Sequence, residues 1–398
     1  MDDPVFPLNS MRSLAHKRQR DSNMKRLFFP LSLLFIALST ACSAWLTQSE
    51  KAQRARWETS PQYSDGTFRN PEQRPPLSLK DGLTMIPKFL FSSEEREPNR
   101  PLPKQQVDLS AFLHPGPSHL SATWLGHSSL LLNVDGFRLL SDPVFAKRVS
   151  PLGPTRYNGD VPLSIAQLPS VDAVLISHDH YDHLNKSSIQ ALDEKTALFI
   201  TGLGVGNRLA QWGVERGKIR ELDWWESLSI RDSLNIVSTP AQHFSGRGLT
   251  DRNRTLWTSW VVEGPQHRIY ISGDSGYFDG FAEIGRRYGP FNMTFVECGA
   301  YNERWRYVHM FPEESVQAHL DLRGDVLHPI HWGTLNLALH PWYEPMQRLK
   351  TAAETAGIQA ATPIVGQTTL YGAALPQIEW WEDVDRVYQV EENHPHEH

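Results

Sequence analysis

Three histidines and two aspartates occupy six consecutive residues of this chain, 178–183. Residues 177–183 read Ser-His-Asp-His-Tyr-Asp-His and directly follow an apolar Ala-Val-Leu-Ile run, which predicts a buried strand. The motif would then lie on the loop that leaves the strand's carboxyl end, where α/β sheets usually carry their chemistry. Because alternate residues of an extended loop point the same way, His178 and His180 can hold one metal ion. Asp182 and His183 then turn toward a second.

Three later segments that resemble strands each lead to a residue of a metal-binding type. Together with the motif they form the expected ligand set: His178, His180 and His243 for one ion, Asp182, His183 and His331 for the other, and Asp274 as a bridge. A nitrogen-rich donor set without thiolates favours two zinc ions, with iron and manganese as alternatives. Such a pair would clamp a hydroxide at neutral pH, because zinc lowers the pKa of bound water to about 7. No protein nucleophile is then needed.

The composition is that of a globular protein, since 40% of the 398 residues are hydrophobic and 21% are charged. The net charge is −6 and the body of the chain has no basic block, so nucleic acid is not expected as a partner. The two cysteines, Cys42 and Cys298, allow at most one disulfide bridge. Cys298 follows an apolar segment and has no activating neighbour, which predicts a buried, inert thiol.

The N-terminal region is typical of an exported protein. Lys25 and Arg26 precede the apolar stretch 27–38, and Ser-Thr-Ala-Cys then ends at Cys42, as in a bacterial lipoprotein signal. We therefore expect residues 1–41 to be an upstream extension and signal peptide, and Cys42 to carry the lipid. An ordinary signal peptide and an uncleaved anchor are the alternatives. The prediction places the protein in the bacterial cell envelope, anchored on the periplasmic side, with the outer membrane as one location.

The rest of the chain divides by composition. Residues 42–117 are rich in Pro, Gln, Arg and Ser and predict an arm or linker that packs on the core. Within it, residues 83–91 could form a short amphipathic helix on the core or a patch that faces lipid. Residues 118–375 alternate strand-like and helical segments, which predicts two sheets covered by helices. Residues 376–398 are expected to be a polar, histidine-containing tail.

On these residues the chain resembles the metallo-β-lactamase superfamily, and more narrowly its branch of N-acyl-phosphatidylethanolamine-hydrolysing phospholipase D. The motif at 178–183 and the spaced His243, Asp274 and His331 carry the broad resemblance. His309 followed by Pro-Glu-Glu, and the Ile-His-Trp-Gly-Thr string around His331, carry the narrow one. The resemblance implies a four-layered αββα sandwich of the α/β class with a dinuclear site at one edge.

The resemblance also implies a zinc-dependent phosphodiesterase of phospholipase D type, acting on phospholipid-like substrates. Asp182, Asp274 and His309 are then the expected catalytic residues, with His309 contacting the phosphate or protonating the leaving oxygen. Met310 and Phe311 replace the acidic helix cap expected there, which would make the site wall more apolar. A dizinc hydrolase of a lactone or amide is one alternative. A non-catalytic envelope protein on the same fold is the other.

The remaining histidines and arginines carry weaker expectations. We expect His127 to support the ligands rather than bind metal, and His319 and His328 to be core residues. Arg247, Arg252 and Arg254 follow His243 and would either steer anions or form a solvated face.

Overall fold

The structure is a computed structural model that describes residues 54–73, 84, 87, 93–113, 119–151 and 153–382. The chain divides into an N-terminal unit, Met1–Thr59, and a main unit, Ser60–His398, which contains the sheets described below. The predicted signal peptide and Cys42 lie outside the described residues. So do residues 83–91, apart from Thr84 and Pro87, and the histidines of the C-terminal tail.

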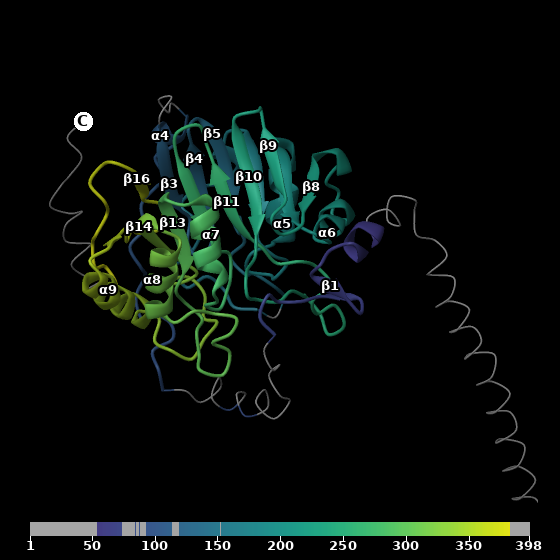
Figure 1. Cartoon of the computed structure of the whole chain (residues 1–398). Helices are drawn as coiled ribbons and strands as arrows, with labels where there is room; N and C mark the ends of the chain where they lie inside the picture. The colour runs from purple at the N-terminus through teal and green to yellow at the C-terminus, as the bar shows by residue number, and fades with distance from the viewer. Residues whose placement is uncertain are drawn as a thin grey trace, which may run out of the picture. The chain divides into compact units, whose positions relative to one another are not determined.

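Two mixed seven-stranded sheets form the centre of the main unit (Figure 1). The strands of the first sheet, in spatial order, are β16 (Thr368–Leu370), β3 (Leu120–Trp124), β4 (Leu130–Val134), β5 (Phe137–Ser141), β6 (Val171–Ile176), β7 (Thr196–Gly202) and β8 (Ile219–Leu222). Those of the second are β15 (Gln359–Ala360), β14 (Gly324–Ile330), β13 (Phe291–Glu297), β12 (Arg268–Ile271), β11 (Ser259–Glu263), β10 (Leu234–Thr239) and β9 (Ser227–Ile230). A separate hairpin pairs β1 (Tyr63–Ser64) with β2 (Thr67–Phe68).

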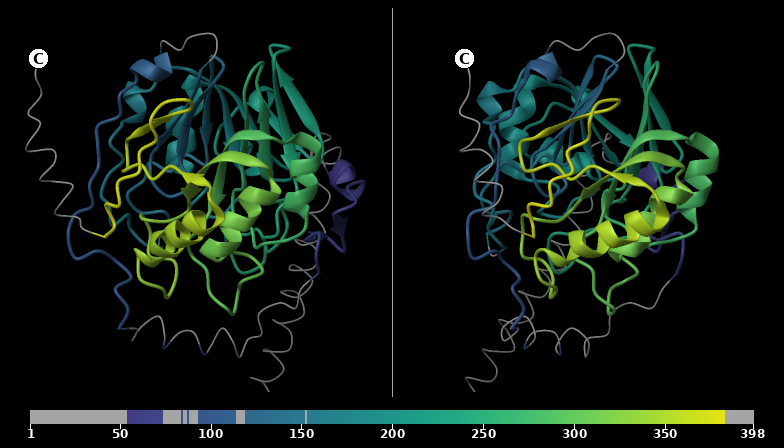
Figure 2. Two further views of the ribbon diagram at one scale, coloured as in Figure 1. Left: turned by 60° about the vertical axis from the view of Figure 1, so that its left-hand side comes forward. Right: turned by 90° about the vertical axis from the view of Figure 1, so that its left-hand side faces the viewer.

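Helices cover the outer faces of the sheets (Figure 2). The α-helices are α4 (Ser110–Leu113), α5 (Lys186–Leu192), α6 (Gly206–Gln211), α7 (Gly280–Tyr288), α8 (Pro312–Asp321) and α9 (Glu344–Ala356). Short 3-10 helices lie at η1 (Ile165–Gln167), η2 (Asp193–Lys195) and η3 (Arg216–Lys218). Within the described ranges, no helix combines the length and apolar character that crossing a bilayer requires.

The alternation of side chains along the first sheet separates two hydrophobic layers. In β4, Leu130 and Leu132 belong to the core that the two sheets share, whereas Leu131 belongs to the core under α5 and α6. Neighbouring strands follow the same rule, because successive residues of a strand face opposite sides of the sheet. Each central strand is apolar on both faces, as expected of a sheet buried on both sides. The layer order is therefore helix, sheet, sheet, helix, and the predicted αββα sandwich is confirmed.

Residues on both sides of the expected domain at 118–375 pack on the folded unit. Trp380 and Trp381, inside the expected polar tail, are 1% and 4% exposed and belong to the hydrophobic core that includes residues of both sheets and of α9. Trp380 stacks on Trp332, with ring centroids 4.9 Å apart, so this part of the expected tail packs on the folded unit. At the other end, Phe68 of the expected arm is fully buried.

Candidate metal centre

The histidine motif occupies the loop that leaves β6, as its position after an apolar run predicted. His178 and His183 are 1% and 0% exposed, whereas His180, Tyr181 and Asp182 between them are half-buried. The amides of His183 and Leu184 both donate to the His180 carbonyl, which closes a tight turn. This turn sends the two ends of the motif to different groups of ligand-type residues.

The first group contains His178, His180, His243 and Asp274. His180 Nδ1 lies 2.8 Å from His178 Nε2 and 3.2 Å from His243 Nε2. Asp274 Oδ2 lies 3.8 Å from His178 Nε2 and 3.7 Å from His243 Nε2. Donors bound to one zinc at about 2.1 Å are roughly 3.3 Å apart in a tetrahedron, so this spacing matches a metal site. The structure thus brings together the four residues that the sequence assigned to the first ion and the bridge.

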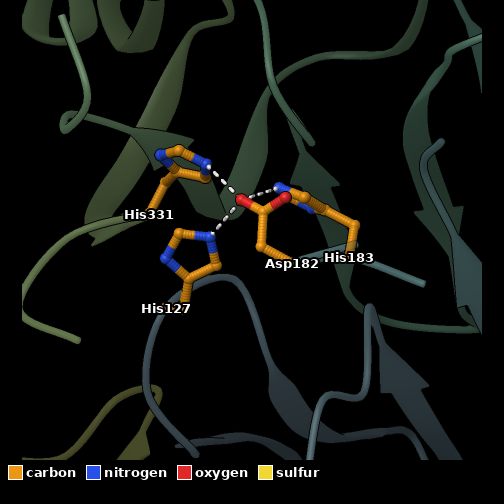
Figure 3. A group of neighbouring side chains, drawn as sticks. All are labelled: His127, Asp182, His183 and His331. Carbon is orange, nitrogen blue, oxygen red and sulfur yellow. Dashed lines mark hydrogen bonds and ion pairs between the residues drawn. The ribbon is translucent and has the colours of Figure 1, made fainter. Parts of the chain in front are cut away.

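The second group contains His127, Asp182, His183 and His331 (Figure 3). Asp182 Oδ2 lies 3.5 Å from Nε2 of both His183 and His331, and it accepts a 2.9 Å hydrogen bond from His127 Nε2. Asp274 joins this group as well, since its Oδ1 is 3.2 Å from His183 Nε2 and its Oδ2 is 3.1 Å from His331 Nε2. Asp274 therefore contacts both groups, which is the placement expected of a bridging carboxylate.

The electrostatics of the site favour a bound cation. Burial lowers the pKa of His180 to about 4 and lowers the pKa values of His178 and His243 well below the usual value, so these rings are neutral at pH 7. Burial alone would raise the pKa of Asp274, but His183 and His331 lower it well below the usual value. The three rings of the first group thus have the protonation state that binds metals. In the second group burial alone would lower the pKa values of His183 and His331, but the neighbouring carboxylates raise the pKa of His183 well above its usual value and that of His331 to about 10, so this group stabilises positive charge.

Buried donor atoms provide a second test of the fit. His183 Nε2, His331 Nε2 and Asp274 Oδ1 are buried, and none completes a hydrogen bond within the described part of the chain. Native structures rarely leave buried polar atoms unpaired, because each costs about 1–3 kcal/mol. All three atoms face the space around Asp274, within reach of the other donor atoms. A cation there would satisfy them together, so the residues present fit a metal.

The loops around the site hold unusual backbone conformations. His127, Asp142 and His331 have φ angles of 56°, 41° and 64°, in the left-handed region that non-glycine residues seldom adopt. Such strain costs on the order of 1 kcal/mol per residue and concentrates at functional sites. Gly273 has a φ of 58°, and a Cβ there would lie 2.6 Å from the Ser177 Cβ. Only glycine lets the Asp274 loop approach the motif loop this closely.

A set of outer contacts fixes the ligand loops. Asp142, fully buried, accepts hydrogen bonds from His183 Nδ1 at 2.8 Å and from Ser177 N and Oγ at 2.8 and 2.6 Å. Engaging Nδ1 in this way leaves His183 Nε2 free of a proton and available to a metal. In the arm, Asn70 Nδ2 donates to the His243 carbonyl at 2.7 Å, and Asn70 Oδ1 accepts from His243 N at 2.9 Å.

Comparisons with known proteins agree with this geometry. A family model described as a beta-lactamase superfamily domain matches residues 137–332. The chain is 34% identical to N-acyl-phosphatidylethanolamine-hydrolyzing phospholipase D 1 of Caenorhabditis elegans over 307 residues, which cover 71% of this chain and 85% of the relative. The chain belongs to the metallo-β-lactamase superfamily. Within it, the chain falls in the branch that resembles this phospholipase D, and it is a metal-dependent hydrolase.

Two further relatives of this superfamily member extend the comparison. An uncharacterized protein of Mycobacterium tuberculosis is 43% identical over 337 residues, covering 82% of this chain and 89% of the relative. A metallo hydrolase from the archaeon Ignicoccus hospitalis, of solved structure, aligns with a TM-score of 0.51 at 22% identity. The alignment covers 64% of this chain and 100% of that one, and it supports the superfamily fold.

Other predicted residues have distinct positions. His309 Nδ1 is 2.8 Å from Glu297 Oε2, and its ring centroid is 5.1 Å from those of both His243 and His331. Met310 is fully buried in the core, so it does not make the site wall more apolar. At the start of α8, where an acidic cap was expected, the Phe311 N–H donates a hydrogen bond to Glu314 Oε2 at 3.0 Å.

The supporting histidine and the two expected core histidines are buried. His127 contacts Asp182, and burial lowers the pKa of His127 to about 3. His319 and His328 are fully buried away from the ligand groups, and His319 Nδ1 is 2.6 Å from Thr294 Oγ1. Cys298 is a buried free thiol, and burial raises its pKa well above the usual value.

Two carboxylates at the site were not foreseen. Asp142 directly follows β5, and Glu297 is the last residue of β13. Both stand at the end of a buried strand, which is the same signal that located the histidine motif. That rule, applied to every strand rather than only to histidine-rich loops, would have found them.

Proposed function

We propose that this protein is a zinc-dependent phosphodiesterase of phospholipase D type that hydrolyses N-acyl-phosphatidylethanolamine-like phospholipids. The observation that carries the proposal is the pair of ligand groups joined by Asp274. The printed activity of the Caenorhabditis elegans relative supplies the substrate class. Two zinc ions would bind, the first to His178, His180 and His243, and the second to Asp182, His183 and His331, with Asp274 between them.

Zinc in such a site supplies Lewis acidity and lets a water ionise near neutral pH. The chain's own residues do the rest. Asp142 and the Val308 carbonyl, 2.8 Å from His243 Nδ1, orient two of the imidazoles. The burial of His178 and His183 keeps bulk water from these ligands, which strengthens every electrostatic contact inside.

A cleft beside His243 supports a phospholipid as the substrate. It has a volume of about 270 Å³. Its walls combine aromatic rings with guanidinium and amide groups, contributed among others by Phe68, Phe244, Tyr307, Arg252, Arg304 and Asn253. The Arg252 guanidinium lies 4.2 Å from the Phe244 ring centroid, and Phe244 packs against the rings of His180 and His243. Such a wall suits a molecule with an anionic head and apolar chains.

The decisive experiment is hydrolysis by purified, zinc-loaded protein. N-acyl-phosphatidylethanolamine in mixed micelles should yield phosphatidic acid and the N-acylethanolamine, while Asp274→Asn should reduce the release to background. A wild-type protein that holds about two zinc ions and cleaves no phosphodiester would refute the proposal. Turnover of lactones or amides by that same preparation would favour a hydrolase of another bond.

We propose further that Cys42 is lipidated and holds the enzyme at the periplasmic side of the bacterial envelope, next to its substrate. Labelled fatty acid should be incorporated by the full-length protein and lost in Cys42→Ser. Labelling that persists in Cys42→Ser would exclude this anchor.

A further inference from the structure

Glu297 is the carboxylate best placed to act on the reaction without binding metal. It ends β13, its side chain is fully buried, and it lies where the loops carrying Asp274, His309 and His331 meet. A buried carboxylate in such a position must be satisfied by hydrogen bonds or by a positive group, because an isolated buried charge is very costly.

Each oxygen of Glu297 has its own partners. Oε1 accepts hydrogen bonds from the backbone amides of Ser275 at 3.1 Å and Met310 at 3.0 Å. Oε2 accepts from His309 Nδ1 at 2.8 Å. His331 Nδ1 is 3.8 Å from Oε2, which is beyond hydrogen-bond distance. Within the described residues no Lys or Arg pairs with this carboxylate, so His309 is its counterpart.

These contacts decide which ring nitrogen of His309 is available to a substrate. Since Nδ1 donates to Glu297, the nitrogen left for substrate is Nε2. The His309 ring lies 5.1 Å from the ring of His243, in one ligand group, and 5.1 Å from that of His331, in the other. It is therefore held between the two groups, and its side chain keeps 14% exposure. A phosphodiester placed across both groups would lie beside this ring.

We propose that Glu297 is a positioning residue, which holds His309 with its Nδ1 protonated so that Nε2 serves the leaving oxygen of the substrate. The inference rests on the proposed phosphodiester hydrolysis. In the step concerned, the oxygen of a water forms a bond to phosphorus and the bond from phosphorus to the leaving oxygen breaks. As that bond forms, the water gives a proton to the unprotonated Nε2 of His309. The electron pair of the broken bond stays on the leaving oxygen, which then takes this proton from Nε2 and departs as an alcohol.

A competing role for Glu297 as a metal ligand is disfavoured by the geometry. An ion between Glu297 and His309 would have to replace their 2.8 Å hydrogen bond. Oε1 already satisfies two backbone amides, and losing that acceptor would leave both amides unpaired in a buried place. Metal content therefore separates the two roles, since a positioning residue can be changed without losing an ion.

Glu297→Gln tests the positioning role directly. The amides of Ser275 and Met310 require an oxygen on the Oε1 side, so the new NH₂ group faces His309 Nδ1 and donates to it. The neutral His309 ring must then carry its proton on Nε2. Nitrogen-15 NMR of histidine-labelled, zinc-loaded protein should show the Nδ1–H form in the wild type and the Nε2–H form in the variant. His309→Ala identifies the signal, and an unchanged tautomer would overturn the proposal.

Leaving-group dependence gives the second readout. A general acid matters most for a poor leaving group, so Glu297→Gln should slow release of the N-acylethanolamine by about 10²- to 10⁴-fold. Bis(4-nitrophenyl) phosphate, whose leaving group needs no proton, should lose less than about tenfold. Equal losses on both substrates, or loss of zinc, would mean that Glu297 only maintains the structure or binds metal. Both outcomes reject the proposal.

Glu221→Gln is the matched control. Its Oε1 also accepts two backbone amides, from Gly204 at 2.7 Å and Gly206 at 2.9 Å, but it stands at the end of β8, outside the ligand groups. It should leave both rates unchanged. If the wild type binds zinc yet cleaves neither diester, the proposed function fails. The tautomer measurement still decides the role of Glu297.

Discussion

Replacing Asp142 by asparagine should weaken metal binding more at the ligand group that contains His183 than at the group that contains His178. Asp142 accepts hydrogen bonds from three donors: Ser177 N on Oδ1, and Ser177 Oγ and His183 Nδ1 on Oδ2. Asparagine keeps the shape but offers one oxygen. Because the Ser177 amide cannot turn away, the oxygen stays with it and the NH₂ group faces His183.

The expected magnitude follows from the displaced proton. With an NH₂ group opposite Nδ1, the neutral His183 ring must carry its proton on Nε2, the nitrogen that lies 3.2 Å from Asp274 and 3.5 Å from Asp182. The protein must then break this arrangement to bind metal. Loss of such an orienting partner costs about 10- to 100-fold in metal affinity, or roughly 1.4–2.7 kcal/mol. His178 meets Asp142 only through Ser177 Oγ, which lies 2.9 Å from His178 Nδ1, so the first group should lose less affinity than the second.

Zinc titration against a competing chelator measures the two affinities separately. Asp135→Asn is the matched control. Like Asp142, Asp135 accepts from three donors that include a histidine Nδ1, here the backbone amides of Gln266 and His267 and the Nδ1 of His267, and it belongs to none of the ligand groups of the described residues. It should leave both zinc affinities unchanged. An Asp142→Asn protein with normal affinities, or with the same loss at both groups, would refute the reasoning.

Three other predictions follow from the same structure. Arg208→Ala removes the guanidinium that pairs at 2.7 Å with the buried Asp179 of the motif. It should lower the free energy of unfolding, measured in urea, by about 2 kcal/mol. Lys350→Ala, which removes an exposed pair with Glu354, should cause no measurable loss. Arg252→Ala should raise KM for an anionic phosphodiester and so lower kcat/KM about fivefold. Arg254→Ala, on the same loop but outside the cleft wall, should leave kcat/KM unchanged. Equal effects of the two substitutions would contradict a contact between Arg252 and the substrate. Zinc at a thousandfold its Kd should raise the free energy of unfolding by about 4 kcal/mol, measured with and without chelator, and no shift would mean that the folded site does not bind it.

The ligand set could be predicted because each ligand leaves a strong local trace. The motif compresses three histidines into one loop, and a short apolar run before it marks the strand. His243, Asp274 and His331 each follow a segment that reads as a strand, and the edge of a sheet gathers such positions. The alternation of segments predicted two sheets covered by helices, but the full αββα arrangement came from the resemblance to the superfamily, because strand patterns alone do not say which sheet a strand joins.

The supporting shell could not be predicted, since its residues are single acids or amides at large sequence separation. Glu297 meets Ser275 and His309 only after β13 and β12 pair in parallel. Asn70 reaches His243 across 173 positions. Trp380 lies in a segment with several charged residues, so the composition of the segment gives no sign that this side chain is buried. Such contacts depend on the tertiary arrangement rather than on local pattern.

The division of the ligands between the two sheets has a consequence for how the protein is assembled. The motif lies on a loop of the first sheet, whereas His243, Asp274 and His331 lie on loops of the second. Each sheet therefore contributes only part of the ligand set. Neither half could retain a cation firmly by itself. A bound ion would therefore connect the two halves of the sandwich. It would bind only after the halves have docked, so hydrolytic activity would appear as the last step of folding.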